Sequence, residues 1–342
     1  MLYVTTRNNQ DVFTAHRVLH ENRGPDGGFY LPMRMPSFSS DEMRIWMEKP
    51  FNQCVAELLN LLFGTKLTGW DVDFSVGRYP VRLKEVRHRI LLAETWHNPE
   101  WSFCRLERCL AEHLQGCQAT PSSWISIGIR IAVLFGVFGE LLRNGVIAPE
   151  DKLDISVVSG DFAAPVSAWY ARSWGLPVGN IVCCCNENSE IWNLICHGYL
   201  RTDLVSIPTC TPLADVTLPE YLEHLIYHCG GIEEVEHFLD VCRHGNAYYP
   251  NEQTLSKLKD RLFISVTSNM RVKDTIPSVY KTHNYLISPY TALAYAGLLD
   301  YRAKKRESCH ALILADFSPL CDCETVSAAM GIPVGKIREY MK

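Results

Sequence analysis

From Trp124 onward, short runs of apolar residues alternate along the chain with stretches of helical periodicity. This alternation is typical of a mostly parallel β-sheet covered by helices on both faces. The sequence therefore predicts an α/β fold with flanking helices. Strands are expected at 155–158, 181–185, 263–266 and 311–314, and helices at 164–174, 218–228, 232–242, 290–303 and 323–330.

The part of the chain before Trp124 is predicted to be largely helical. Apolar residues at 12, 15, 18 and 19 share one helical face, and Ser39 is a suitable N-cap for a second helix. A third helix is expected around the apolar stripe formed by Cys54, Val55, Leu58, Leu59 and Leu62. The apolar run at 90–93 is predicted to be a buried strand.

Composition argues against a nucleic-acid-binding protein. The chain has 342 residues, 47% of them hydrophobic, with 33 basic and 38 acidic side chains. No cluster of cations interleaved with aromatic residues occurs, which is the usual footprint of nucleic acid binding. The cation-rich stretch 78–89 also contains Glu85 and is interpreted as the exposed face of a helix.

The 14 cysteines are interpreted as reduced thiols, because a chain of this length does not need disulfides to stabilise its core. The first residues do not resemble a signal peptide, so we expect a cytoplasmic protein. The most apolar stretch, 125–142, is interrupted by Arg130 and falls short of the ~20 apolar residues of a membrane span. It is predicted to be a buried helix, and no membrane association is expected.

Seven segments match, in one order, the motifs of an enzyme family. The family motifs are Y-x-S-T-R-G, A-P-D-G-G-L-Y-V-P, S-G-N-F-G, A-G-Y-x-A-K-x-M-G-L-P, N-E-N, T-x-S-P-A-M-D-I and D-P-H-T-A-V. The chain thus resembles the threonine synthases, which are fold type II enzymes that use pyridoxal phosphate (PLP). The resemblance implies a fold similar to the large domain of those enzymes. The matching segments are Tyr3 to Arg7, Gly24 to Pro32, Ser159 to Ala163, Ala168 to Pro177, Asn186 to Asn188, Thr209 to Val216 and Ser288 to Leu293.

The family motif that carries the PLP lysine, H-G-P-T-x-A-F-K-D, resembles residues 97–105, with His97, Pro99 and Phe103 in register. Cys104 stands at the lysine position, and a thiol cannot form the Schiff base from which PLP chemistry starts. Only 20 residues lie between Phe103 and Trp124, where the family has a complete βαβ segment. The resemblance therefore implies a small domain that is largely deleted.

The family's phosphate-binding loop corresponds to Ser159, Gly160, Asp161, Phe162 and Ala163. Asp161 replaces an asparagine and places a carboxylate where phosphate would sit, while Ala163 replaces a glycine; both changes oppose phosphate binding. The loop is therefore predicted to be structural. Other residues at pocket positions of the family are Asn186, Asn188, Thr291 and Asp316, the last at a position expected near the pyridine nitrogen.

A thiol-dependent enzyme is an alternative, with Cys104 as the nucleophile and His97 as its base. A reactive cysteine needs a lowered pKa, a nearby cation and an oxyanion site, and the sequence offers only Arg105 as the cation. A divergent lyase that acts on an amino acid and uses PLP without the usual lysine is a further alternative.

No metal site is predicted. The run Cys183 to Cys185 has the alternation of a buried strand, and Cys321 and Cys323 lack a second cysteine pair at zinc-finger spacing. His224 and His228 have the spacing of metal ligands on a helix, but the favoured interpretation is a polar helix face. That face would also carry His237, His244 and glutamates at 220, 223, 233, 234 and 236.

Together these features predict a threonine synthase-like protein that has lost PLP-dependent catalysis, holds no cofactor and acts by binding, regulation or as a scaffold. If it were active, the expected activity would be that of a carbon-oxygen lyase. The expected organisation is an N-terminal extension at 1–95, a remnant of the lysine motif and small domain at 96–123, and an α/β domain at 124–342. Loss of the small domain would uncover apolar surface, so we expect a homodimer or a protein partner through residues 96–138. Binding of a small-molecule ligand is a further alternative.

Overall fold

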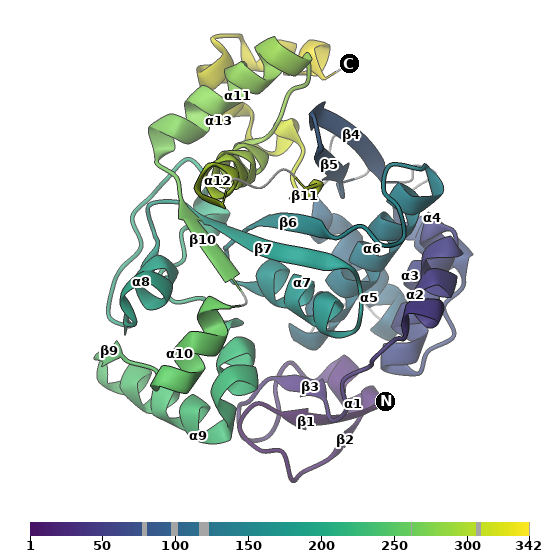
Figure 1. The fold of residues 1–342 in the computed structure, drawn as a ribbon, viewed down its shortest axis with the longest axis vertical. Coiled ribbons are helices and arrows are strands. Elements are labelled where there is room, and N and C mark those ends of the chain that lie inside the picture. Colours follow the sequence, from purple (N-terminus) through teal and green to yellow (C-terminus); the bar gives the residue numbers. More distant parts are fainter. Residues whose placement is uncertain (77–80, 97–101, 116–122, 261, 306–308, 342) are drawn as a thin grey trace.

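A six-stranded sheet forms the centre of the fold (Figure 1). The computed structural model describes residues 1–76, 81–96, 102–115, 123–260, 262–305 and 309–341. The first five strands in the order below are parallel, and the last pairs antiparallel with its neighbour. The predicted α/β fold is therefore confirmed. The order is β10 (Leu262–Val266), β7 (Val178–Cys185), β6 (Leu153–Val158), β11 (Ala311–Ala315), β5 (Ile90–Glu94) and β4 (Arg82–Arg87).

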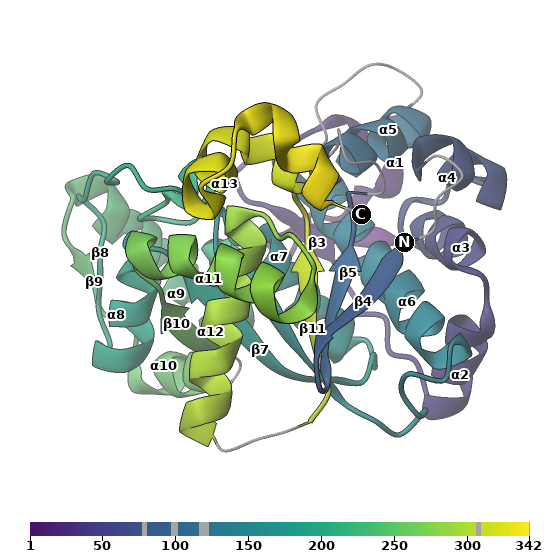
Figure 2. The same cartoon turned by 90° about the horizontal axis from the view of Figure 1, so that it is seen from above.

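Helices cover both faces of this sheet (Figures 1 and 2). One face carries α11 (Asn269–His283), α12 (Pro289–Lys305) and α13 (Cys323–Met330), and the other carries α6 (Ser123–Arg143) and α7 (Ala163–Ser173). Cys183 and Cys185 belong to the core on the α6 side and Cys184 to the core under α12, as their alternation predicts. The sheet is therefore buried on both faces, as is usual for parallel strands.

The N-terminal residues form a small antiparallel sheet with four helices beside it. Ser39 caps the second helix in a capping box with Glu42, as predicted. Arg7 docks this unit onto a later helix, donating from Nη2 and Nε to Glu223 at 2.9 and 3.1 Å. The elements are β1 (Leu2–Thr5), β2 (Phe13–Thr14), α1 (Ala15–His20), β3 (Tyr30–Pro32), α2 (Ser40–Glu48), α3 (Phe51–Phe63) and α4 (Gly69–Val76).

The remaining helices and strands do not belong to the six-stranded sheet. They are α5 (Phe103–Gln115), α8 (Glu190–His197), β8 (Leu200–Arg201), α9 (Leu222–His244), β9 (Ala247–Tyr248) and α10 (Glu252–Lys259), with 3-10 turns at Pro212–Ala214, Pro319–Asp322 and Val334–Tyr340. The two helices expected at 218–228 and 232–242 correspond to α9, which is broken at Gly231, where φ is +81°. Glycine adopts this backbone conformation without the steric cost of a side chain.

The apolar helix α6 is a core helix, as predicted for 125–142. It is long and apolar enough to cross a membrane by length and composition, and most of it is buried inside the protein. Helices α2, α3 and α7 pack against it, and Trp124 at its start is fully buried. The uncovered apolar surface expected after loss of a small domain is thus not formed by α6. Association through residues 96–138 stays a prediction.

One secondary-structure prediction is wrong. The stretch 78–89 was expected to be helical, yet Arg82–Arg87 form β4, paired antiparallel with β5. The chain turns back tightly between the two strands at Arg89, where φ is +59°. Pairing with the buried strand β5 thus decides the local conformation. Because β4 and β5 join the sheet, the sheet draws strands both from 1–95 and from 124–342.

Candidate functional site

The candidate site lies where three neighbouring parallel strands end. From β6 the chain proceeds outward to β7 and β10, and β11 then returns to the other side of β6, next to β5. The direction of the strand order changes between β6 and β11, and ligands of open α/β sheets bind outside the carboxyl ends of the strands at this place. Thr95 follows β5, Asp316 follows β11, and the loop 159–163 follows β6.

Arg130 and Asp316 form the centre of the site. Arg130 of α6 donates from Nη1 to Asp316 Oδ2 at 2.9 Å, and its guanidinium lies over the Phe103 ring at 4.1 Å. Thr95 Oγ1 donates to the other Asp316 oxygen at 2.7 Å. The Phe103 amide donates to the Asp316 carbonyl at 2.7 Å, which fixes the start of α5 against the end of β11.

Acidic side chains outnumber this cation. The carboxylates of Asp316, Glu107 and Asp161 all act electrostatically on Arg130, and together they raise the pKa of its guanidinium despite its burial. Burial raises the pKa of Glu107, although attraction to Arg130 and a hydrogen bond with Ser126 oppose this shift. Three carboxyl groups around one guanidinium make this a poor place for a further anion.

In the loop after β6, the amide at the start of α7 is already bonded. Asp161 Oδ1 accepts from the Ala163 amide at 2.9 Å, and the Asp161 carbonyl accepts from the Tyr221 amide at 3.1 Å. The Phe162 amide donates to the Ser159 carbonyl at 2.8 Å, and Gly160 has a positive φ of 46°. Amides at a helix N-terminus are natural anion donors. Here the Asp161 side chain takes the Ala163 amide itself.

Cys104 lies in the first turn of α5, beside the Arg130 and Asp316 pair. Although the residue is exposed, its thiol is desolvated enough to raise its pKa. Arg130 lowers this pKa, while Glu107 and Asp316 raise it further. A raised pKa disfavours the thiolate that a nucleophile or a metal ligand requires. His97, the base proposed for this thiol, lies outside the described residues.

Comparisons with known proteins agree with this fold. Residues 2–75 match the family model described as the threonine synthase N terminus. Threonine synthase from Pseudomonas aeruginosa is 25% identical over 192 residues, which are 55% of this chain. Threonine synthase-like 1 from Pongo abelii is 25% identical over 183 residues, or 52% of this chain.

Over part of its length, the chain is similar to the threonine synthases. Its match spans 40% of the length of the Pseudomonas protein and 24% of the length of the Pongo protein. The crystal structure of PLP-bound threonine synthase from Brucella melitensis superposes with a TM-score of 0.83 at 16% identity, covering 97% of this chain and 92% of that one. This likeness confirms the fold type II architecture.

The two asparagines of the N-E-N segment, Asn186 and Asn188, bond to the loop that contains residues 207–215. Asn186 Nδ2 donates to Thr209 Oγ1, Thr211 Oγ1 and Asp215 Oδ1 at 2.8 to 3.0 Å. Asn188 Nδ2 donates to the Ile207 carbonyl at 2.9 Å and to Asp215 Oδ1 at 3.1 Å. Both side chains are buried, and their polar groups bond to the chain between β8 and α9.

Thr291 has a similar local role at the start of α12. Its hydroxyl lies 3.0 Å from Ser288 Oγ, and its amide donates to the same oxygen at 3.2 Å. Both residues are buried. Of the predicted pocket residues, the structure therefore brings together Cys104, Asp161 and Asp316 around Arg130, and assigns Asn186, Asn188 and Thr291 to contacts within the fold.

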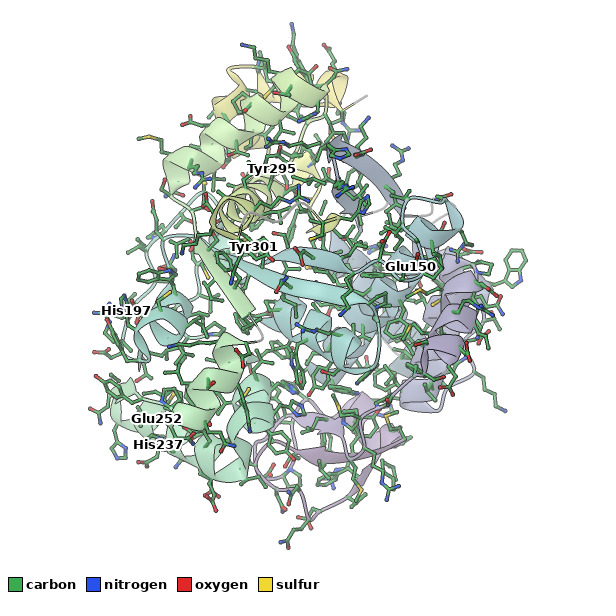
Figure 3. The ribbon with its side chains drawn as sticks, in the orientation of Figure 1. Glu150, His197, His237, Glu252, Tyr295 and Tyr301 are labelled. Atoms are coloured by element: carbon green, nitrogen blue, oxygen red, sulfur yellow. The ribbon has the colours of Figure 1, made fainter. Side chains whose placement is uncertain are left out.

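The histidines of α9 do not form one polar face, so that interpretation is wrong. His224 is fully buried, and Tyr170 Oη lies 3.0 Å from its Nδ1 and 2.9 Å from Nε2 of His228. His237, by contrast, lies at the periphery with its side chain 51% exposed (Figure 3). Within the described ranges, no three His, Cys, Asp or Glu side chains group as metal ligands.

Two charged residues of the site were missed as site residues in the sequence. Arg130 carried a usable signal, because a lone charge inside an apolar helix is expected to have a partner. Glu107 carried none, since it is one of several polar residues in an amphipathic stretch. Its position near Arg130 depends on how α5 and α6 pack.

Proposed function

We propose that this chain is a threonine synthase-like protein without PLP-dependent catalysis, acting as a binding, regulatory or scaffold protein. The observation that carries the proposal is the bond from the Ala163 amide to the Asp161 carboxylate. It places a negative charge at the helix N-terminus that corresponds to the family's phosphate loop. A phosphate group at this end would face a fixed carboxylate instead of a free amide.

The residues at the centre of the site also do not fit the cofactor. Among the charged side chains that act on Cys104, Arg130 and Glu107, none is a lysine in the described part of the chain. These described side chains therefore supply no amine that could form the family's Schiff base at this place. Arg130, the cation that is present, is already bonded to Asp316.

The raised pKa of Cys104 argues against the thiol-dependent alternative. A nucleophilic cysteine is activated by a lowered pKa, and here desolvation and two carboxylates act in the opposite direction. A divergent lyase would need an amine or another activating group that enters the site from elsewhere.

Thermal-shift measurements on the full chain test the proposal. A ligand that binds the native state raises the melting temperature by mass action. We expect PLP, phosphohomoserine and inorganic phosphate each to leave the melting temperature unchanged, while an authentic threonine synthase responds to PLP in parallel. A saturable rise with PLP, accompanied by a visible absorption band, would refute the loss of cofactor chemistry.

A further inference from the structure

A cavity lies on the other face of the sheet from Arg130. Along β5, Leu91 and Ala93 belong to the core on the α6 side, whereas Ile90 and Leu92 belong to the core under α12. Because side chains alternate along a strand, Glu94 points to the α12 side and Thr95 to the Arg130 side. Glu94 lines a cavity of about 330 Å³ at this end of β4 and β5.

Glu94 is a buried carboxyl group, and one of its two oxygens has no hydrogen-bond partner in the described part of the chain. The residue is 4% exposed, and Tyr285 Oη donates to its Oε1. Its Oε2 is buried and accepts no hydrogen bond from the described residues. Burial raises the pKa of this carboxyl, while the Tyr285 bond and the charges of Arg82 and Lys84 lower it. A buried polar atom without a partner destabilises the protein, so a donor in the cavity would relieve this cost.

Two cations stand at the mouth of the same cavity. Arg82 is the direct cross-strand partner of Glu94, and Lys84 follows on the same face of β4. Both residues are exposed, and neither forms an ion pair within the described ranges, although Lys84 Nζ lies 6.0 Å from the Tyr285 ring centre. Cross-strand neighbours have Cβ atoms ~5 Å apart, so a positive and a negative group lie side by side here.

The remaining walls are aromatic and apolar. Trp96, which is 6% exposed, lines the cavity together with Tyr285, Tyr340 and Leu286. Binding cavities for small molecules commonly combine such apolar walls with a few polar groups that fix orientation. The chain supplies a hydrogen-bond acceptor, two cations and an apolar wall within one small volume.

We propose that this cavity binds a zwitterionic α-amino acid with an aromatic or other apolar side chain. The ammonium group would donate to Glu94 Oε2, and the carboxylate would accept from Arg82 and Lys84. The ammonium nitrogen and the carboxylate carbon of an α-amino acid are both bonded to the α-carbon, so its two charges lie close together, as do Glu94 and Arg82 as direct cross-strand partners. The side chain would lie against Trp96 and Tyr340. This site is separate from the Arg130 cluster and does not depend on PLP.

Isothermal titration of the full chain with L-phenylalanine tests the site, with L-leucine and L-tryptophan as further probes. Two analogues separate the contributions of the two charged groups to binding: 3-phenylpropanoate lacks the ammonium group, and phenethylamine lacks the carboxylate. We expect saturable binding of L-phenylalanine and at least ~10-fold weaker binding of both analogues, because each leaves a charged group of the cavity unpaired.

Glu94→Gln and Arg82→Gln should each weaken L-phenylalanine binding at least ~10-fold, since each removes the partner of one charged group. Arg82 is exposed, so its variant is expected to fold even if Glu94→Gln does not. Arg87→Gln, which changes an exposed cation on the same strand outside the cavity, is the matched control and should bind as the wild type does. No binding of any of the three amino acids, or equal binding of L-phenylalanine by Arg82→Gln and Arg87→Gln, would overturn the site.

Discussion

Arg130 and Asp316 are joined by a 2.9 Å ion pair whose side chains are only 16% and 17% exposed. The pair connects the core helix α6 to the carboxyl end of β11, at the place where an α/β sheet of this topology binds its ligands. The cation that an anionic ligand would need is therefore already used within the protein.

A double-mutant cycle measures the strength of that pair. Asp316→Asn should lower the free energy of unfolding by about 1–3 kcal/mol, because the partly buried guanidinium loses its charged partner. Combined with Arg130→Met, it should give a coupling energy between about 0.5 and 3 kcal/mol. Chemical denaturation is the measurement. The exposed pair Arg44 and Glu48, 3.8 Å apart, is the matched control and should couple by less than ~1 kcal/mol. Equal coupling in the two pairs would contradict the structural role.

The loop after β6 should regain anion binding when its carboxylate is removed. Asp161→Asn combined with Ala163→Gly removes the charge that bonds the Ala163 amide and lets the backbone approach a ligand. We expect inorganic phosphate to raise the melting temperature of this variant and not that of the wild type. Ala163→Gly alone serves as the control and should stay unresponsive. If the double variant does not respond either, the proposal that the Asp161 carboxylate keeps phosphate from this loop fails.

Acid should destabilise the protein partly through His224. Burial, followed by the charges of His228 and Arg23, lowers the pKa of His224 well below 6.5. In the unfolded chain His224 therefore binds a proton near pH 6.5, whereas in the folded chain it stays neutral at this pH. The free energy of unfolding should fall as pH drops below ~6.5, by up to about 1.4 kcal/mol per pH unit.

His224→Gln should reduce the slope of unfolding free energy against pH between pH 7 and 5, measured by urea denaturation. The exposed His244 on the same helix is the control, and His244→Gln should leave the slope as in the wild type. Identical slopes in all three proteins would mean that burial does not hold His224 neutral in the folded protein.

We expect self-association close to residues 96–138, which were predicted to form an interface with a second copy or a protein partner. Trp70 and Phe74, one turn apart on α4, are 82% and 81% exposed, and the Phe74 ring lies 5.8 Å from that of His113 on α5. Exposed aromatic clusters commonly mark interfaces. Sedimentation at micromolar concentration should show a dimer that Trp70→Glu with Phe74→Glu converts to a monomer. Met270→Glu, at another exposed apolar residue, should leave the dimer intact. If the wild-type protein sediments as a monomer, the proposed dimer is wrong.

The sequence predicted the central fold because its signals there were local. The apolar runs of β6, β7, β10 and β11 and the periodicity of α12 are readable without tertiary contacts. By contrast, β4 is charged and half-exposed, and only its pairing with β5 makes it a strand. The helices α10 and α11 were missed because their sequences are mostly polar, with few buried residues each.

The site was only partly predictable from sequence. Cys104, Asp161 and Asp316 were found because they replace residues of family motifs, and the structure brings them near one another. Arg130 was indicated as a charge inside an apolar helix, but its partner Asp316 is distant in the sequence, and no local pattern encodes their contact. His224 was assigned to a polar helix face because histidine and glutamate suggest exposure, yet Tyr170 from α7 provides a buried partner for it.

Borohydride reduction of the full chain in the presence of PLP, followed by peptide mapping, tests directly whether the chain forms a Schiff base with PLP. Borohydride converts a Schiff base between PLP and a lysine into a stable adduct, which mass spectrometry then locates. Because Cys104 is predicted to stand at the position of the family's lysine, we expect no stoichiometric adduct at any single lysine, only low and scattered labelling. An authentic threonine synthase treated in parallel should be labelled at one lysine. A single, stoichiometric pyridoxyl-lysine in this chain would contradict the account.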